Sequence, residues 1–99
     1  MKHVVTATVY DKRGIPISSA QNSYIKTHPL MARAAKEAGQ AYRIYLHAEV
    51  AALVKADWSR AHSMFVSRFD RTGRPVNATP CVVCQRVIKM AGIKKVRHT

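Results

Sequence analysis

The chain has 99 residues, 47% of them apolar, and carries 17 Lys and Arg against five Asp and Glu, a formal charge of +12. This length fits one compact domain, residues 1–99, and excludes a second independent core. No run approaches the roughly 20 apolar residues of a membrane span and no signal peptide is visible, which predicts a cytoplasmic protein without a membrane partner.

The first third of the sequence predicts a hairpin followed by a helix. Residues 3–10 alternate in polarity as a strand does, and the turn residues 11–14 should return the chain antiparallel over residues 15–21. A helix over residues 29–38 should begin at its proline and stop at Gly39, a natural left-handed cap.

The second half alternates helices with strands. A helix from near His47 to about Asp57 should carry three apolar residues toward the core: Val50, Leu53 and Val54. A strand, a loop, a helix and a short strand are predicted next, over residues 63–69, 70–80, 81–90 and 93–97. Because a helix crosses between the last two strands, they should be parallel, which predicts an α/β fold with helices on both faces of the sheet.

Two short motifs carry the chemistry: His47-Ala48-Glu49 and, 31 residues after Glu49, Pro80-Cys81-Val82-Val83-Cys84. Together they match the H-x-E and P-C-x-x-C pattern of zinc deaminases. A catalytic zinc keeps three protein ligands and leaves its fourth position to water, so one imidazole and two thiolates suffice. The positive end of a helix favours both cysteines as thiolates. The sequence predicts one Zn²⁺ per chain, held by His47, Cys81 and Cys84.

Glu49 is predicted to move protons rather than to bind the metal. It lies two residues from His47, so the two side chains point in different directions at a helix start. Zinc lowers the pKa of its water toward about 7, and a neighbouring carboxylate can take that proton and return it to the ring nitrogen and the leaving amine.

Other interpretations of the cysteine pair remain. A C-x-x-C motif is also typical of a dithiol redox pair, although that motif normally opens a helix after an early strand. A structural zinc site would need a fourth ligand, for which His28 or His62 would serve. Otherwise we expect the remaining histidines, Trp58 and most tyrosines to be packing or surface residues: His3, His28, His62 and His98, with Tyr24 the best-placed tyrosine for stacking.

Because of these motifs, the chain resembles the cytidine and deoxycytidylate deaminase superfamily. Within it, the chain is most similar to small deoxycytidylate-deaminase-like proteins of bacteria and phages. The resemblance covers nearly the whole length, strongly in residues 46–49 and 80–84 and more weakly in residues 20–23, 26–29 and 66–68. It implies a three-layer α/β/α sandwich around a mixed sheet, three zinc ligands (His47, Cys81 and Cys84) and Glu49 as the catalytic proton shuttle.

The resemblance also implies contacts with the substrate. Asn22 would contact the base or sugar, and the backbone of Ala48 and the carbonyl of Thr79 would face the base edge and its amine. Asn followed by Ser is also typical of a turn, so a purely structural role for Asn22 stays open. Three arginines near the loop before Pro80 are phosphate candidates, with solvated surface as the alternative: Arg68, Arg71 and Arg74.

The function expected from this resemblance is deamination of a free cytosine nucleoside or nucleotide to its uracil counterpart. The alternatives are a base in single-stranded RNA or DNA, for which the +12 charge would help, a purine, and a non-catalytic zinc module that binds nucleic acid. The sugar and the number of phosphates are not determined. Family members commonly continue past the fourth strand, whereas this sequence ends at Thr99, so we expect a homo-oligomer that covers a leftover edge or face.

Overall fold

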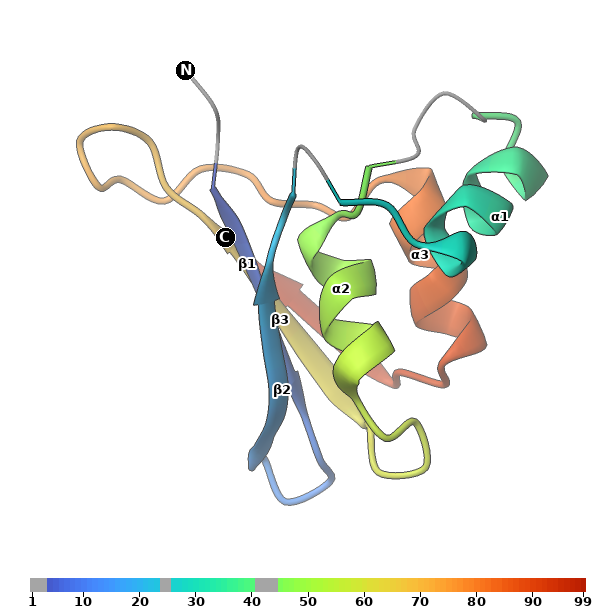
Figure 1. The fold of residues 1–99 in the computed structure, drawn as a ribbon. Coiled ribbons are helices and arrows are strands. Elements are labelled where there is room, and N and C mark those ends of the chain that lie inside the picture. The colour runs from blue at the N-terminus through green and yellow to red at the C-terminus, as the bar shows by residue number, and fades with distance from the viewer. Residues whose placement is uncertain (1–3, 24–25, 41–44) are drawn as a thin grey trace.

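The computed structural model describes residues 4–23, 26–40 and 45–99 (Figure 1). Three helices and four strands occur in these residues. In chain order they are β1 (Val5–Tyr10), β2 (Pro16–Gln21), α1 (Pro29–Glu37), α2 (Ala48–Lys55), β3 (Ser63–Arg68), α3 (Val82–Met90) and β4 (Lys95–His98). Each predicted element is present, and its ends lie within two residues of the predicted ones.

The four strands form one mixed sheet in the order β2-β1-β3-β4. Strand β1 pairs antiparallel with β2 and with β3, and β3 pairs parallel with β4. The prediction of an α/β fold whose last strands are parallel is therefore confirmed. None of the described helices is long and apolar enough to cross a membrane.

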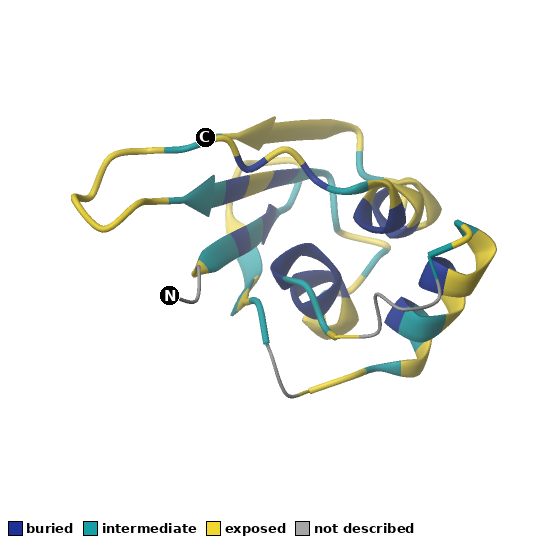
Figure 2. Cartoon of the chain, turned by 90° about the horizontal axis from the view of Figure 1, so that it is seen from above, coloured by how far each residue is buried: buried dark blue, intermediate teal, exposed yellow. Residues whose placement is uncertain are grey.

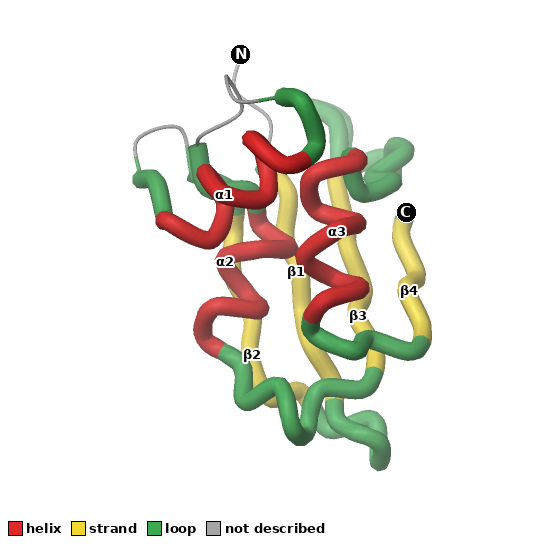
Figure 3. Tube along the Cα trace, turned by 90° about the vertical axis from the view of Figure 1, so that its right-hand side faces the viewer, coloured by secondary structure: helices red, strands yellow, loops and turns green. Residues whose placement is uncertain are grey.

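All three helices lie on the same face of this sheet (Figures 1 and 3). Helix α2 packs directly on β1 and β2, and α1 packs against α3 rather than on a strand. Within the described residues no helix covers the other face, so they do not form the second helical layer of the predicted three-layer sandwich. The local sequence period shows that a helix has an apolar face, but the side of the sheet it covers depends on tertiary packing.

The core lies between the sheet and the helices. Ala7 and Val9 of β1 and Met64 and Val66 of β3 are buried on the helical side, as their alternation requires. Helix α2 is the most buried helix: its first six residues, 48–53, are all buried (Figure 2).

The prediction that Val54 lies in the core is wrong. Val50 and Leu53 are fully buried, but Val54 is 41% exposed. Each helical residue is turned about 100° from the one before it, and Val54 falls on the solvent side of α2. The helix ends at Lys55, before the predicted Asp57, where the indole Nε1 of Trp58 donates a 2.8 Å hydrogen bond to the carbonyl oxygen of Leu53.

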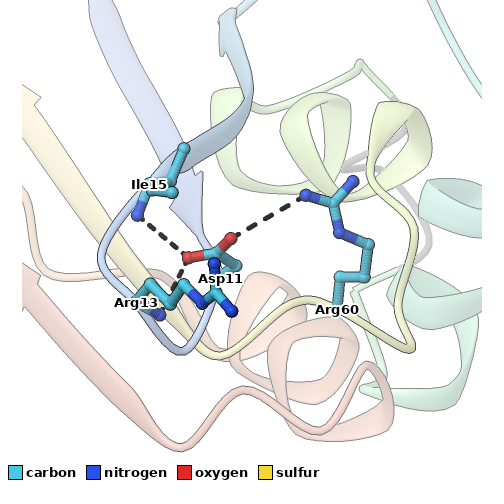
Figure 4. Close-up of polar contacts among 4 residues, drawn as sticks. All are labelled: Asp11, Arg13, Ile15 and Arg60. Atoms are coloured by element: carbon cyan, nitrogen blue, oxygen red, sulfur yellow. Dashed lines mark hydrogen bonds and ion pairs between the residues drawn. The ribbon is translucent and has the colours of Figure 1, made fainter.

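The turn of the β1–β2 hairpin is organised by one carboxylate, that of Asp11 (Figure 4). Its Oδ1 accepts hydrogen bonds of 2.9 Å from the backbone N–H groups of Arg13 and Ile15. Its Oδ2 lies 3.8 Å from Nη2 of Arg60, in the segment after α2. The carboxylate therefore fixes the turn and joins it to a segment 49 positions further along the chain.

Candidate metal centre and adjoining pocket

The candidate ligands come from the N-terminal ends of two helices. His47 directly precedes α2, and Cys81 directly precedes α3, with Cys84 in the first turn of that helix. Both helices have extended backbone at the residue before them, and both begin at the same end of the molecule (Figure 1). The fold thus brings together residues that are 34 and 37 positions apart in the sequence.

The three ligand atoms are close enough for one metal ion. Nδ1 of His47 lies 3.2 Å from Sγ of Cys84 and 3.5 Å from Sγ of Cys81, and all three atoms lie within 4.8 Å of one another. Tetrahedral zinc with bonds of about 2.0–2.3 Å to nitrogen and sulfur places neighbouring ligand atoms roughly 3.5–3.8 Å apart. The group can therefore hold one metal ion, and its donor set and spacing are compatible with zinc.

The two other histidines considered as a fourth ligand do not join this group. Nδ1 of His28 accepts a 3.0 Å hydrogen bond from the backbone N–H of Leu30 and caps the start of α1. His62 lines a hollow at the far end of the sheet, beside Tyr10. Among the described residues the metal group consists of one histidine and two cysteines, which leaves a coordination position for water or substrate.

The two cysteine side chains shift each other's pKa in opposite directions. A hydrogen bond from the Cys84 side chain lowers the pKa of Cys81 to about 3, and donating that bond, together with burial, raises the pKa of Cys84. The hydrogen bond favours the thiolate of Cys81, and the expectation that both cysteines are thiolates stays a prediction for the metal-bound site. Binding of a metal cation must release the proton of Cys84.

Glu49 lies in the first turn of α2 and is 6% exposed. It is not one of the three grouped ligands, and it lines the pocket beside them. Burial raises the pKa of its carboxyl group above the usual range. A buried carboxyl group with a raised pKa is suited to accept and release protons near neutral pH.

A pocket of about 420 Å³ adjoins the metal group. All three predicted substrate contacts line it: Asn22, Ala48 and Thr79. Oδ1 of Asn22 accepts a 2.9 Å hydrogen bond from the backbone N–H of Val5, so the structural role considered for this asparagine is present. A contact with substrate stays a prediction for all three residues.

Sequence reasoning did not single out three further lining residues: Ser23, Tyr45 and Asn77. Oδ1 of Asn77 accepts hydrogen bonds from the backbone N–H of Thr79 at 3.0 Å and from its hydroxyl at 2.6 Å, which shapes the loop just before Pro80. The N-x-T spacing immediately before the P-C-x-x-C motif was a usable signal for Asn77. Tyr45 lies two residues before His47, and nothing in the local pattern marks its position.

Of the three arginines considered for phosphate, only Arg68 lines this pocket. It ends β3, and its Nε is buried without a hydrogen-bond partner. Arg71 and Arg74 lie in the exposed turn that Asp70 organises, outside the pocket lining. His3 and Tyr24 lie outside the described residues.

The arrangement combines a soft metal-binding group, a buried carboxyl group and a pocket of small-molecule size with both polar and apolar lining residues. Such a site is chemically suited to hydrolysis of a small polar substrate. No model of a known protein family matches this chain, and no curated protein matches it.

Proposed function

We propose that this protein is a zinc-dependent hydrolytic deaminase of a free cytosine nucleoside or nucleotide. The observation that carries the proposal is the grouping of His47, Cys81 and Cys84 beside the buried Glu49 at one pocket. One imidazole, two thiolates and a non-ligand carboxylate in H-x-E and P-C-x-x-C motifs are the combination that zinc deaminases use.

The chemistry assigns one task to each group. Bound Zn²⁺ would supply an activated water by lowering its pKa toward about 7. Glu49 takes one proton from the attacking water and delivers it to the ring nitrogen, and it then carries the second water proton to the leaving amine. A carbon–oxygen bond forms at C4 of cytosine and the carbon–nitrogen bond breaks. One water is consumed, one ammonia is released, and Glu49 returns to its starting state.

The pocket residues would orient the base. Asn22 is held by its bond to Val5 and can present its amide to the base or sugar. The backbone of Ala48 and the carbonyl of Thr79 would meet the base edge and the exocyclic amine. These assignments follow the family resemblance, and the pocket lining is compatible with them.

Arg68 favours a phosphorylated substrate. It lines the pocket and is the one arginine of the three considered for phosphate that does so. Arginine binds phosphate through planar, charge-assisted hydrogen bonds, so Arg68 is suited to hold a phosphate group at this pocket. We therefore propose a nucleoside monophosphate in preference to a nucleoside.

Two alternatives use the same site: a base within single-stranded RNA or DNA, supported by the +12 charge, and a purine. A non-catalytic zinc module is the alternative from another class. The resemblance further implies a helical layer on the second face of the sheet, which the described residues do not supply. The deaminase proposal therefore rests on the site and not on the complete architecture.

A screen of the zinc-loaded protein separates these alternatives. Ammonia release is measured on cytidine, deoxycytidine, their monophosphates, adenine and guanine compounds and a short single-stranded oligonucleotide, with Glu49→Gln as the control. We expect turnover of a cytosine monophosphate that the variant lacks. Turnover of the oligonucleotide alone would show that the substrate is a base in nucleic acid. No ammonia release from any compound despite bound zinc would overturn the enzyme proposal.

A further inference from the structure

The face of the sheet opposite the helices is polar, aromatic and basic. Paired residues of neighbouring strands project to the same face, so the registers define rows across the sheet. One row crosses all four strands from β2 to β4: Ser19, Thr8, Phe65 and Arg97. The next row contains Tyr10, Ser63 and Lys95. We call these seven residues the open face.

The open face offers three kinds of contact. Phe65 is 38% exposed, so part of its ring is available for stacking. Lys95 and Arg97 are exposed on β4 and, two residues apart on one face, lie about 7 Å from each other along the strand. The hydroxyl groups of Thr8 and Ser19 lie 3.3 Å apart at an exposed position and can exchange hydrogen bonds with a ligand.

Acidic groups are nearly absent from this face. A hollow of about 450 Å³ runs along it and includes Lys12 and His62 besides the aromatic and basic residues. Among the described residues that line it, the only acidic one is Asp11, whose carboxylate is bound by the hairpin turn and by Arg60. The other four acidic residues of the chain lie on the helices or in the loops that follow α2 and β3: Glu37, Glu49, Asp57 and Asp70.

The charge decides which occupant fits. A second copy of the chain would bring another +12 charge against Lys95 and Arg97, which disfavours pairing of two open faces. A polyanion gains from the same charges by releasing its counterions. An exposed ring beside hydroxyl and cationic groups suits unpaired bases, because duplex bases are already stacked on each other.

We propose that the open face binds single-stranded nucleic acid, with Phe65 stacking on a base and Lys95 and Arg97 contacting phosphates. The face is separate from the candidate metal centre. The pocket of that centre is lined by Val5 and Arg68, whereas the hollow on the open face is lined by Tyr10 and Ser63, at the other ends of β1 and β3. The binding surface therefore does not depend on the proposed deaminase activity.

The test is fluorescence anisotropy with a labelled 12-nucleotide oligo(dT), titrated at several salt concentrations. In Lys95→Gln/Arg97→Gln we expect weaker binding and a log K against log salt slope reduced by about 1.4, roughly 0.7 for each lost contact. The matched control, Lys36→Gln/Lys89→Gln, removes the same charge from exposed positions on α1 and α3 and should keep the slope.

The aromatic contact has its own variant. Phe65→Leu keeps an apolar side chain, and we expect it to weaken binding about five-fold or more with an unchanged slope, while Phe65→Trp retains binding. Circular dichroism and thermal melting confirm that each variant is folded. Three binding results would each overturn the proposal: equal weakening in the two charge variants, tight binding of a duplex that is insensitive to Phe65→Leu, or no binding near physiological salt. A change of mass by light scattering in Phe65→Leu would also overturn it, because it would assign the face to a second copy of the chain.

Discussion

The two cysteines of the candidate metal group differ in how readily they lose a proton. A hydrogen bond from Cys84 lowers the pKa of Cys81 to about 3, which favours its thiolate. The pKa of Cys84 is raised by that same bond and by burial, so a cation must displace its proton to bind the sulfur. Metal binding should therefore release a proton and weaken as the pH falls.

The first prediction concerns zinc content. Cys84→Ser should reduce zinc from about one ion per chain to far below one, because a hydroxyl group is a poor replacement for a thiolate ligand. The measurement is elemental analysis of the dialysed protein. Val82→Ser, at an exposed position one residue after Cys81, is the control and should keep its zinc. Full zinc occupancy in Cys84→Ser would refute the ligand assignment.

The second prediction concerns Arg68. Arg68→Gln should raise the KM for a cytosine monophosphate about ten-fold or more and leave the KM for the nucleoside unchanged, because only the phosphate pairs with the guanidinium group. Arg71→Gln and Arg74→Gln, outside the pocket lining, should change neither value. Equal increases for nucleoside and nucleotide would show that Arg68 does not recognise phosphate.

At the scale of elements, α2 is the helix that places Glu49, and its stability depends on one buried face. Leu53 is fully buried whereas Val54, the next residue, is 41% exposed. Leu53→Ala should lower the free energy of unfolding by about 2–5 kcal/mol, because it leaves a cavity under the sheet. Val54→Ala should change it by less than about 0.5 kcal/mol. Urea denaturation measures both, and similar losses at the two positions would contradict the packing of α2.

The hairpin turn gives a prediction about pH. The pKa of Asp11 is lowered chiefly by the backbone hydrogen bond from Ile15. The ionised carboxylate therefore stabilises the fold fully above the pKa of the unfolded chain, about 3.8, and this stabilisation is lost as the pH falls through the lower pKa of the folded state. Asp11→Asn should therefore show a smaller drop in Tm between about pH 5 and pH 2 than the wild type. Arg60→Gln should have little effect, since an exposed ion pair at 3.8 Å contributes weakly. An unchanged acid profile in Asp11→Asn would refute this role.

Local sequence patterns predicted the helices and strands well. The alternation of Ala7 and Val9, the proline at the start of α1 and the glycine after it are short-range signals, and the structure follows them. The end of α2 was less predictable, because the hydrogen bond from Trp58 to Leu53 at that end uses a side chain that the apolar pattern does not take into account. The exposure of Val54 follows from its place on the solvent side of α2, about 100° around the helix from the buried Leu53.

At the scale of the whole molecule, the sequence predicted the sheet but not the placement of all helices on one face. Motif spacing identified His47, Cys81 and Cys84, which the fold brings within 4.8 Å of one another. It did not identify Asn77, although the N-x-T spacing before Pro80 was a usable signal, or Tyr45, which reaches the pocket only where loops distant in the sequence meet at one end of the sheet. The homo-oligomer stays a prediction, and a sharp monomer in light scattering at micromolar concentration would contradict it.

The central claim is that Glu49 moves protons at a zinc-dependent deaminase site. Its most direct test is the rate of ammonia release from a cytosine monophosphate by the wild type and by Glu49→Gln, with zinc measured on the same samples. We predict uracil nucleotide and ammonia from the wild type, and a rate at least about 100-fold lower in the variant with equal zinc. Equal rates in the two proteins, or no turnover by the zinc-loaded wild type, would contradict the claim.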